Sequence, residues 1–408
     1  MPVIREAVLE QAHFMTTEEV RPVGGGRIVE LVWRRHREDT IRFKTCFLVY
    51  RLPLLLIIFA FAFASSALAQ SLFCPARHAN EVAVINTSTN QVFTHIPVGS
   101  FPIRIVMTPD RRKAFISDGL SASISVLDTV ARTNIATIRV SGLPGESAVT
   151  PDGGRLFVVH QGGLHGNCPV DVIDTATNQI ITTVFIPGNW AKHILLTPDG
   201  RSAYVANFSR GEVDVIDTTT YQVTNIPTAA GSRRLCISST GDRVYVANDK
   251  GNSVSAIDTA TNRVIATIPV GRGPLGIGIT PNDEEVYATN QGTGTVSVIN
   301  TTTLTAIATI PTGNLPQRVV ITGDGTKAFV ENGYSDTVSV IDTATHTVIA
   351  TLPTGRDPFT IMANADDTKL YVCNAGDTTI TVIDIPSLTV SDTIANVGLA
   401  PFDLAFGP

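Results

Sequence analysis

Short apolar runs alternate with turn residues along nearly the whole chain after residue 70. One phrase recurs eight times, from "VAVINT" at 82–87 to "ITVIDI" at 380–385, and its fifth residue is separated from that of the next copy by 42, 46, 43, 41, 42, 42 and 42 positions. A period near 42 residues over eight copies is typical of a repeat architecture.

Each repeat contains four runs of about six residues with the composition of β-strands. In the unit that begins at Gly271 these runs are "PLGIGIT", "EVYATN", "TVSVIN" and "AIATIPT". The segments between runs carry turn residues, with "TPDG" at 150–153 after a first run and "DTATN" at 174–178 after a third. Four antiparallel strands in a unit of about 40 residues predict a β-propeller blade.

The two ends of the repeat region complement each other. Strands expected at 72–76, 81–87 and 91–96 supply the second to fourth strands of a blade, and "APFDLAFGP" at 400–408 supplies a first strand. Pairing of these ends would close the ring without a free edge. Seven further units begin near residues 99, 142, 188, 229, 271, 313 and 355. The sequence therefore predicts an all-β propeller of eight four-stranded antiparallel blades, with seven blades as the alternative.

A different pattern precedes the repeats. A thirteen-residue apolar run at 52–64 follows Arg42, Lys44 and Arg51, and "ALA" at 67–69 offers small side chains to a signal peptidase. This pattern predicts a secretory signal peptide at 52–69, because the run is shorter than the about 20 residues of a membrane span. An uncleaved anchor is the alternative. Residues 1–51 form a polar leader without a repeating pattern, for which a start codon assigned too early is one explanation.

The predicted propeller domain, 70–408, is acidic. Without the leader and signal the chain has 21 basic and 29 acidic residues, a net charge of −8. It has neither a basic tail nor a second apolar span, which argues against duplex nucleic acid as a partner and against stable membrane insertion after cleavage. We expect a periplasmic, secreted or cell-surface monomer.

Several motifs carry a resemblance to a known family. "YVAN" at 204–207 and 245–248, "YATN" at 287–290 and "YVCN" at 371–374, together with "VIDTATN", "IPVG" and "TPDG", resemble the YVTN-type β-propeller repeat. The resemblance covers 72–408 and implies the propeller fold and an extracytoplasmic location, but no particular activity. The family is usually seven-bladed. Similar eight-bladed rings include the domains that hold haem d1 in nitrite reductases.

The loops that lead into the first strands and the loops between second and third strands share one face of a propeller, around its channel. On this face, most blades have a proline where the loop enters the first strand. The residue two positions after this proline, or after its equivalent, varies between blades, while the next residue is apolar in all blades but one, which has Ser147. The variable residues are Arg104, Glu146, His193, Arg234, Gly276, Arg318, Thr360 and Asp403, with Arg233, Arg272, Arg356 and Lys192 close by. This local positive charge would attract carboxylates or phosphates. Mutually paired, solvated rim charges are the plainer interpretation.

The segment "HQGGLHGNC" at 160–168 lengthens one repeat by four residues. His160 takes the position that asparagine has in five other blades, where side-chain hydrogen bonds to the backbone are the simplest role. His165 and Cys168 are metal-ligand residue types, but three such residues on a glycine-rich loop are a weak motif and we predict no metal. A specificity loop acting with Trp190 and His193 is the alternative, as is plain loop variation.

The cysteines Cys74 and Cys373 fall in neighbouring blades. Facing sheets pack about 10 Å apart, whereas a disulfide needs Cα atoms within about 7 Å. We therefore expect no disulfide there.

The chain contains no HExxH, GxSxG or P-loop motif. We expect a binding or scaffolding module for an anionic small molecule, a glycan or a protein, without a resident cofactor. The candidate ligand-binding residues are Arg104, Glu146, His160, His165, Trp190, His193, Arg234, Arg318 and Asp403. One alternative is a lyase or a lactone or ester hydrolase, with His193 or His160 as the base. The other is a haem-like cofactor carrier whose carboxylates pair with the arginines.

Overall fold

The computed structural model describes residues 18–23, 26–31, 70–162 and 166–408, and the chain divides into two units, Met1–Ser65 and Ser66–Pro408. In the first unit, β1 (Glu18–Val23) and β2 (Gly26–Leu31) form an antiparallel pair. The sequence of this segment has no repeating pattern, so no hairpin was predicted there. The predicted signal peptide lies outside the described residues. Within the described ranges, no helix has the length and hydropathy needed to span a membrane.

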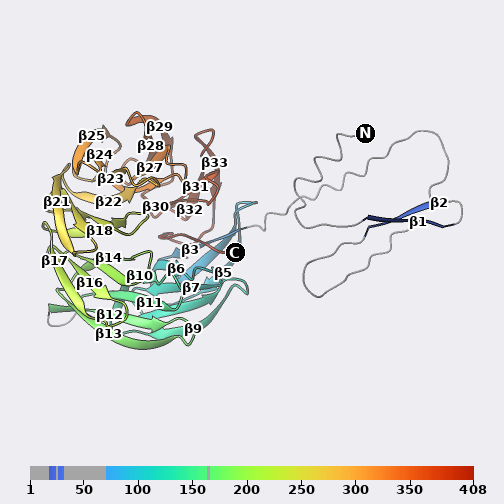
Figure 1. The fold of residues 1–408 in the computed structure, drawn as a ribbon, viewed down its shortest axis with the longest axis horizontal. Coiled ribbons are helices and arrows are strands. Elements are labelled where there is room, and N and C mark those ends of the chain that lie inside the picture. The colour runs from blue at the N-terminus through green and yellow to red at the C-terminus, as the bar shows by residue number, and fades with distance from the viewer. Residues whose placement is uncertain (1–17, 24–25, 32–69, 163–165) are drawn as a thin grey trace. The chain divides into compact units, whose positions relative to one another are not determined.

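The second unit is a ring of eight four-stranded antiparallel sheets, which confirms the all-β propeller and the count of eight blades (Figure 1). The first blade is composite, because the C-terminal β34 pairs with β3 from the N-terminal end. Its strands are β34 (Ala405–Phe406), β3 (Ser71–Ala76), β4 (Glu81–Asn86) and β5 (Gln91–Pro97).

Blades 2 to 8 each take four consecutive strands. Blade 2 contains β6 (Pro102–Met107), β7 (Lys113–Asp118), β8 (Ser123–Asp128) and β9 (Thr133–Arg139). Blade 3 contains β10 (Leu143–Val149), β11 (Arg155–Gln161), β12 (Asn167–Asp174) and β13 (Gln179–Pro187). Blade 4 contains β14 (Ala191–Leu196), β15 (Ser202–Asn207), β16 (Glu212–Asp217) and β17 (Val223–Pro227). Blades 5 and 6 contain β18 (Ser232–Ile237), β19 (Arg243–Asn248), β20 (Ser253–Asp258) and β21 (Arg263–Pro269); β22 (Pro274–Ile279), β23 (Glu285–Asn290), β24 (Thr295–Asn300) and β25 (Thr305–Pro311). Blades 7 and 8 contain β26 (Pro316–Ile321), β27 (Lys327–Asn332), β28 (Thr337–Asp342) and β29 (Thr347–Pro353); β30 (Pro358–Ala363), β31 (Lys369–Asn374), β32 (Thr379–Asp384) and β33 (Thr389–Ile394).

The turns form as their residues predict. In "TPDG" at 150–153, the Asp152 carboxylate accepts hydrogen bonds from the Thr150 hydroxyl and the Gly154 amide, and Gly153 has φ of 75°. Residues other than glycine avoid this region, so the turn needs a glycine or tolerates strain. In "DTATN" at 174–178, Asp174 accepts from the amides of Ala176 and Thr177. These turns fix where each strand ends.

The core lies between neighbouring blades. One apolar cluster joins Phe115, Ile124 and Val126 of blade 2 to Leu156 and Val158 of blade 3, and similar clusters repeat around the ring. Each such side chain contributes about 1.5–3 kcal/mol when it is fully buried. Because the second and third strands are covered on both faces, they are nearly continuous in apolar residues.

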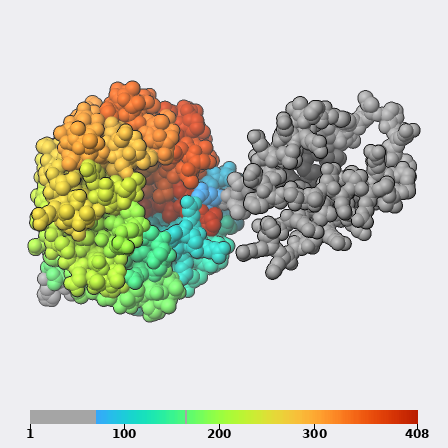
Figure 2. Space-filling view, in the orientation of Figure 1, coloured from blue at the N-terminus to red at the C-terminus, as the bar shows by residue number. Residues whose placement is uncertain are grey.

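Ring closure brings together segments that are far apart in sequence. Leu72 and Phe73 of β3 pair with Phe406 and Ala405 of β34. In Figure 2, blue N-terminal and red C-terminal residues lie against one another at this seam. The closing strand β34 has only two residues, whereas a longer first strand was expected within residues 400–408.

Candidate functional site

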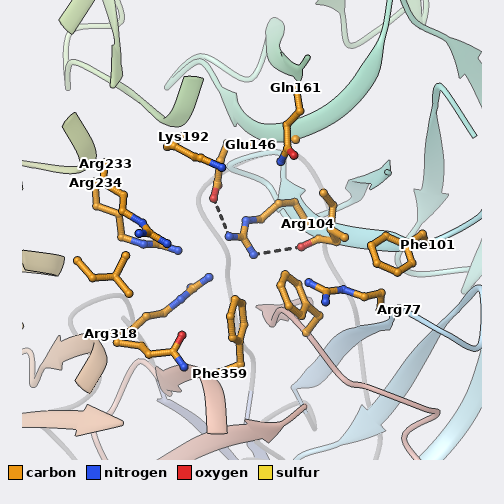
Figure 3. Close-up of a pocket in the computed structure, with 15 residues that line it drawn as sticks. Arg77, Phe101, Arg104, Glu146, Gln161, Lys192, Arg233, Arg234, Arg318 and Phe359 are labelled. Atoms are coloured by element: carbon orange, nitrogen blue, oxygen red, sulfur yellow. Dashed lines mark hydrogen bonds and ion pairs between the residues drawn. The ribbon is translucent and has the colours of Figure 1, made fainter. Parts of the chain in front are cut away.

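A cavity of about 290 Å³ opens at the channel face, lined by residues from most of the blades. Five arginines and one lysine line it, namely Arg77, Arg104, Arg233, Arg234, Arg318 and Lys192; the other lining residues are Phe101, Ile103, Gly145, Glu146, Gln161, Leu275, Gln317, Phe359 and Phe402. Glu146 is the single carboxylate among these lining residues. Figure 3 shows basic side chains directed toward the cavity from different blades.

First strands position the central charges. Arg104, Glu146, Arg234 and Arg318 all come from the variable column, and each lies where a bulge interrupts or borders the pairing between a first and a second strand. Such irregularities reorient side chains near functional sites. The column identified in the sequence therefore does converge on one cavity.

The ion pairs leave the cavity positively charged. The Arg104 guanidinium donates to Glu146 at 2.6 Å, and Arg233 donates to Asp249 at 2.7 Å. Arg318 lies 3.9 Å from Asp403, whose other oxygen accepts the Ile105 amide at 3.2 Å. Some of these charges are thus paired with each other, as expected if the rim carries mutually paired charges. Six basic side chains nevertheless line the cavity, with one carboxylate.

Burial and like charges act together on these groups. Burial, together with the like charges of Arg318 and Arg104, lowers the pKa of Arg234 to about 9, although Glu146 opposes the shift. Burial likewise lowers the pKa of Arg77 to about 10 with a contribution from Arg104. Burial raises the pKa of Glu146, but the attraction of Arg104 and Arg234 outweighs it and lowers the pKa below its usual range. An anion would relieve the repulsion among the arginines.

Aromatic rings form one wall. Phe359 and Phe402 are stacked with centroids 4.0 Å apart, and the Arg77 guanidinium lies 3.3 Å from the Phe402 centroid. The Arg318 guanidinium lies 5.8 Å from the Phe359 ring. These contacts hold the guanidinium groups in place through cation–π attraction.

Glu331 is a charged group behind the arginines that sequence analysis missed. The side chain is fully buried, and neither carboxylate oxygen has a hydrogen-bonding partner among the described residues. Burial raises its pKa to about 7, although Arg318 and Arg234 oppose the shift. Glu331 is the fifth residue of its second strand, and the same position of β23 and β31 holds Thr289 and Cys373. A carboxylate at a position that is otherwise uncharged in these strands was the sequence signal that could have identified Glu331.

The other predicted residues that the structure describes do not line the cavity, although several lie next to residues that do. His193 is not a lining residue, and burial lowers its pKa to about 3, with the nearby arginines adding to the shift and Glu146 opposing it. Trp190 is half exposed and its ring contacts Lys192. Asp403 supports Arg318 from behind. His165 lies outside the described residues.

His160 lies inside blade 3, where it contacts the third strand and not the cavity. It is fully buried, and its Nε2 lies 2.9 Å from Asp171, which also accepts the Ser141 amide at 2.7 Å. Burial raises the pKa of Asp171, but hydrogen bonds from His160, Ser141 and Thr183 outweigh it and lower the pKa to about 2. In other blades an asparagine binds the third strand in the same way, as Asn248 donates to Ser255 at 2.9 Å. His160 thus contacts a side chain of the third strand instead of making the expected hydrogen bond to the backbone, and Asp171 is the residue that accepts the loop amide of Ser141.

The four inserted residues leave this pairing intact. Asn207 contacts Asp214 seven positions later, whereas His160 contacts Asp171 eleven positions later. Cys168 is fully buried and its thiol contacts the His160 carbonyl at 2.7 Å. Among the described residues, no group of three or more metal-ligating side chains is found.

Two basic residues near the column behave differently from Arg233 and Lys192. Arg272 donates to the Gly292 carbonyl at 2.8 Å, and Arg356 pairs with Asp377 at 2.8 Å; neither lines the cavity. Arg77, Phe101, Phe359 and Phe402 line it but were not singled out. Arg77 lies in a loop between second and third strands, and such loops were expected on the channel face. Its position in the sequence could therefore have identified it as a candidate for the cavity.

Comparisons with known proteins support the propeller class. A family model described as "YNCE-like beta-propeller" matches residues 324–408, and one described as "Lactonase, 7-bladed beta-propeller" matches 217–348. The seven-bladed β-propeller protein Rv1057 of Mycobacterium tuberculosis is 29% identical over 226 residues, which is 46% of this chain and 57% of the relative. The uncharacterized protein YwhL of Bacillus subtilis is 25% identical over 162 residues, 40% of this chain and 34% of the relative.

Solved structures show the same fold. Dihydro-heme d1 dehydrogenase NirN, in complex with DHE, has a TM-score of 0.71 at 15% identity, covering 83% of this chain and 75% of that one. Hydrazine synthase of Kuenenia stuttgartiensis has a TM-score of 0.56 at 24% identity, covering 69% of this chain and 95% of that one. A functionally unknown protein from Desulfotomaculum acetoxidans has a TM-score of 0.57 at 17% identity, covering 83% and 98% of the two chains. At these identities the likeness concerns the fold alone.

Proposed function

We propose that this chain is an exported YVTN-type propeller that binds a small multivalent anion in the arginine-lined cavity. The observation that carries the proposal is the charge of the cavity wall, with six basic side chains and one carboxylate around about 290 Å³. This excess is local, because the whole chain has a net charge of −6. The "ALA" signal pattern and the repeat motifs support export and the family.

The wall chemistry narrows the ligand class. Guanidinium groups bind carboxylates and phosphates through paired hydrogen bonds. Arg234 and Arg318 come from different blades and can engage separate anionic groups, while Phe359 and Phe402 provide an apolar surface. The volume suits a small molecule, so a protein or glycan partner would contact the rim and insert only one acidic group. The ligand is therefore a compact molecule with at least two anionic groups.

Hydrolysis is a second candidate, and Glu331 is the observation that favours it. A buried carboxyl with a pKa of about 7 has the acidity of a general base near neutral pH. The lactonase model match at 217–348 spans Arg234, Arg318 and Glu331. His160 is enclosed with Asp171, and neither His193 nor Glu331 lines the cavity. Glu331 fits the base better than His193 because its pKa is about 7, whereas burial lowers the pKa of His193 to about 3. Glu331→Gln would abolish turnover of a carboxylated lactone while citrate binding persists; unchanged turnover would exclude this role.

The arginines fit the carboxylates of a haem-like molecule, but the wall lacks an axial ligand. No histidine, cysteine or methionine occurs among the described lining residues. The cavity therefore does not fit an iron held by the protein, and we do not extend the proposal to such a cofactor.

Isothermal titration calorimetry on the full chain tests the proposal with three probes. Citrate and inorganic pyrophosphate are expected to bind at micromolar to millimolar concentrations with one site per chain, whereas glucose is not. Absence of heat with both anions, or equal binding of glucose, would overturn the proposal.

A further inference from the structure

Neighbouring blades meet through two repeated positions of the second strand. The fifth residue of one second strand packs with the fourth residue of the next, as Val159 does with Val205 and Ala206 with Val246. Side chains alternate between the faces of a strand, so these two positions point toward opposite neighbours. The contact recurs around the ring and fills the space between the sheets.

At the seam between blades 8 and 1, both positions are cysteines. Cys373 is the fifth residue of β31 and Cys74 is the fourth residue of β3. Their sulfur atoms lie 3.7 Å apart and both side chains are fully buried. In consecutive blades of 2 to 8 the same two strand positions hold Ser117 and Val158, Val159 and Val205, Ala206 and Val246, Ala247 and Ala288, Thr289 and Val330, and Glu331 and Val372.

Sheet spacing led us to expect these two cysteines to lie too far apart for a bond, whereas their sulfurs are close, with both thiols free in the structure. Blades converge toward the axis of a ring, and the two Cβ–Sγ arms point at each other across the remaining gap. The two sulfurs are in van der Waals contact, and a shift of about 1.7 Å brings them to the bond length of about 2.0 Å. Burial and the neighbouring Cys74 raise the pKa of the Cys373 thiol well above its usual range, so the thiol is unreactive once the ring has closed.

The ring closes inside blade 1, beside this seam, and the closing strand has less backbone pairing than the first strands of the other blades. β34 supplies two residues, and an isolated bridge joins Ala76 to Pro401, whereas the first strands of the other blades have six or seven residues. The chain between the two cysteines includes almost the whole propeller, with 299 positions from one to the other. A covalent link here would hold both ends of the ring together.

We propose that Cys74 and Cys373 form a disulfide that fastens the closed ring. The oxidant is a small-molecule disulfide such as oxidised glutathione. One cysteine thiolate attacks it and releases one glutathione thiol; the second cysteine then attacks the mixed disulfide and releases the other. Two protein thiols are oxidised while one disulfide is reduced to two thiols. Because both sulfurs are buried in the ring, the exchange takes place before closure, during folding. This proposal does not depend on the anion site.

The test is to refold the full chain in oxidised and reduced glutathione and then to unfold it in N-ethylmaleimide. Of the five cysteines in the chain, three are expected to be alkylated, and peptide mapping is expected to link the Cys74 peptide to the Cys373 peptide. The oxidised protein is expected to melt roughly 4–8 °C above the reduced one. Five alkylated cysteines, or a different linked pair, would overturn the proposal.

Two variants provide controls. Cys168→Ala removes a buried cysteine away from the seam, so the alkylation count is expected to fall from three to two with the seam link retained. Cys74→Ala is expected to remove the melting difference between oxidised and reduced protein, and a difference that persists would contradict the proposal. If Cys74→Ala fails to fold, peptide mapping of the unaltered chain still decides.

Discussion

The Arg104 guanidinium lies 2.6 Å from the Glu146 carboxylate, and this ion pair joins blades 2 and 3 inside the cavity. Glu146 also lowers the net charge that a bound anion meets. Arg104 is held as well by the Ile103 carbonyl at 3.1 Å and lies over the Phe402 ring, so its position does not depend on Glu146 alone.

Replacing Glu146 by glutamine is therefore expected to strengthen anion binding. The cavity loses its single negative charge but keeps its shape, and the affinity for citrate should rise about 3- to 10-fold. Calorimetry at constant pH and ionic strength measures the change. Weaker citrate binding, in a variant whose Tm matches that of the unaltered chain, would show that the carboxylate contributes to the ligand site instead.

Glu331 makes the stability depend on pH with a defined sign. Its pKa is near 4.5 in an unfolded chain and about 7 in the fold. Between these values the native state binds more protons than the unfolded state, so this group makes the free energy of unfolding fall as pH rises from about 4.5 to 7. Glu331→Gln should therefore stabilise the protein by about 2–3 kcal/mol at pH 8 and leave it nearly unchanged at pH 4.

Chemical denaturation at pH 4 and pH 8 checks that prediction. Arg318, Arg234, Asp357 and Arg104 are charged groups that interact with Glu331, and they are present in both proteins. A glutamine variant that is destabilised more at pH 8 than at pH 4 would mean that the ionised carboxylate is favoured by its surroundings, and equal effects at both pH values would mean that the fold does not raise the pKa of Glu331.

His160 is expected to contribute to stability and not to anion binding. His160→Ala would leave the buried Asp171 without one of its partners and should cost about 2–4 kcal/mol. His160→Asn supplies the residue that five other blades carry at this position, and should cost less than about 1 kcal/mol. Urea unfolding measures both. A citrate affinity that falls more than about threefold in the asparagine variant would place His160 in the ligand site.

Citrate binding should weaken as salt is added. The attraction comes from several partly buried cations, so an increase in sodium chloride from about 50 to 500 mM should reduce the affinity at least about tenfold. Titrations at three salt concentrations give the slope. An affinity independent of salt would indicate that the ligand is held by the apolar wall of Phe359 and Phe402.

The repeat period predicted the fold well because each blade depends on local strands and turns. The variable column predicted Arg104, Glu146, Arg234 and Arg318 of the cavity for the same reason, since the repeat fixes where each residue faces. Long-range relationships were not accessible in this way. Arg77 lies in a loop between second and third strands, where its position was a signal outside the variable column, whereas the contact of Cys74 with Cys373 depends on how the blades converge at the seam.

The most direct test of the central claim compares two arginine variants by citrate calorimetry. Arg234→Met removes a charge from the cavity wall, whereas Arg272→Met removes one from the corresponding loop of the next blade, outside the cavity. The account predicts that Arg234→Met weakens citrate binding about 10- to 100-fold and that Arg272→Met changes it less than about twofold. Equal affinities for the two variants would contradict binding in the cavity.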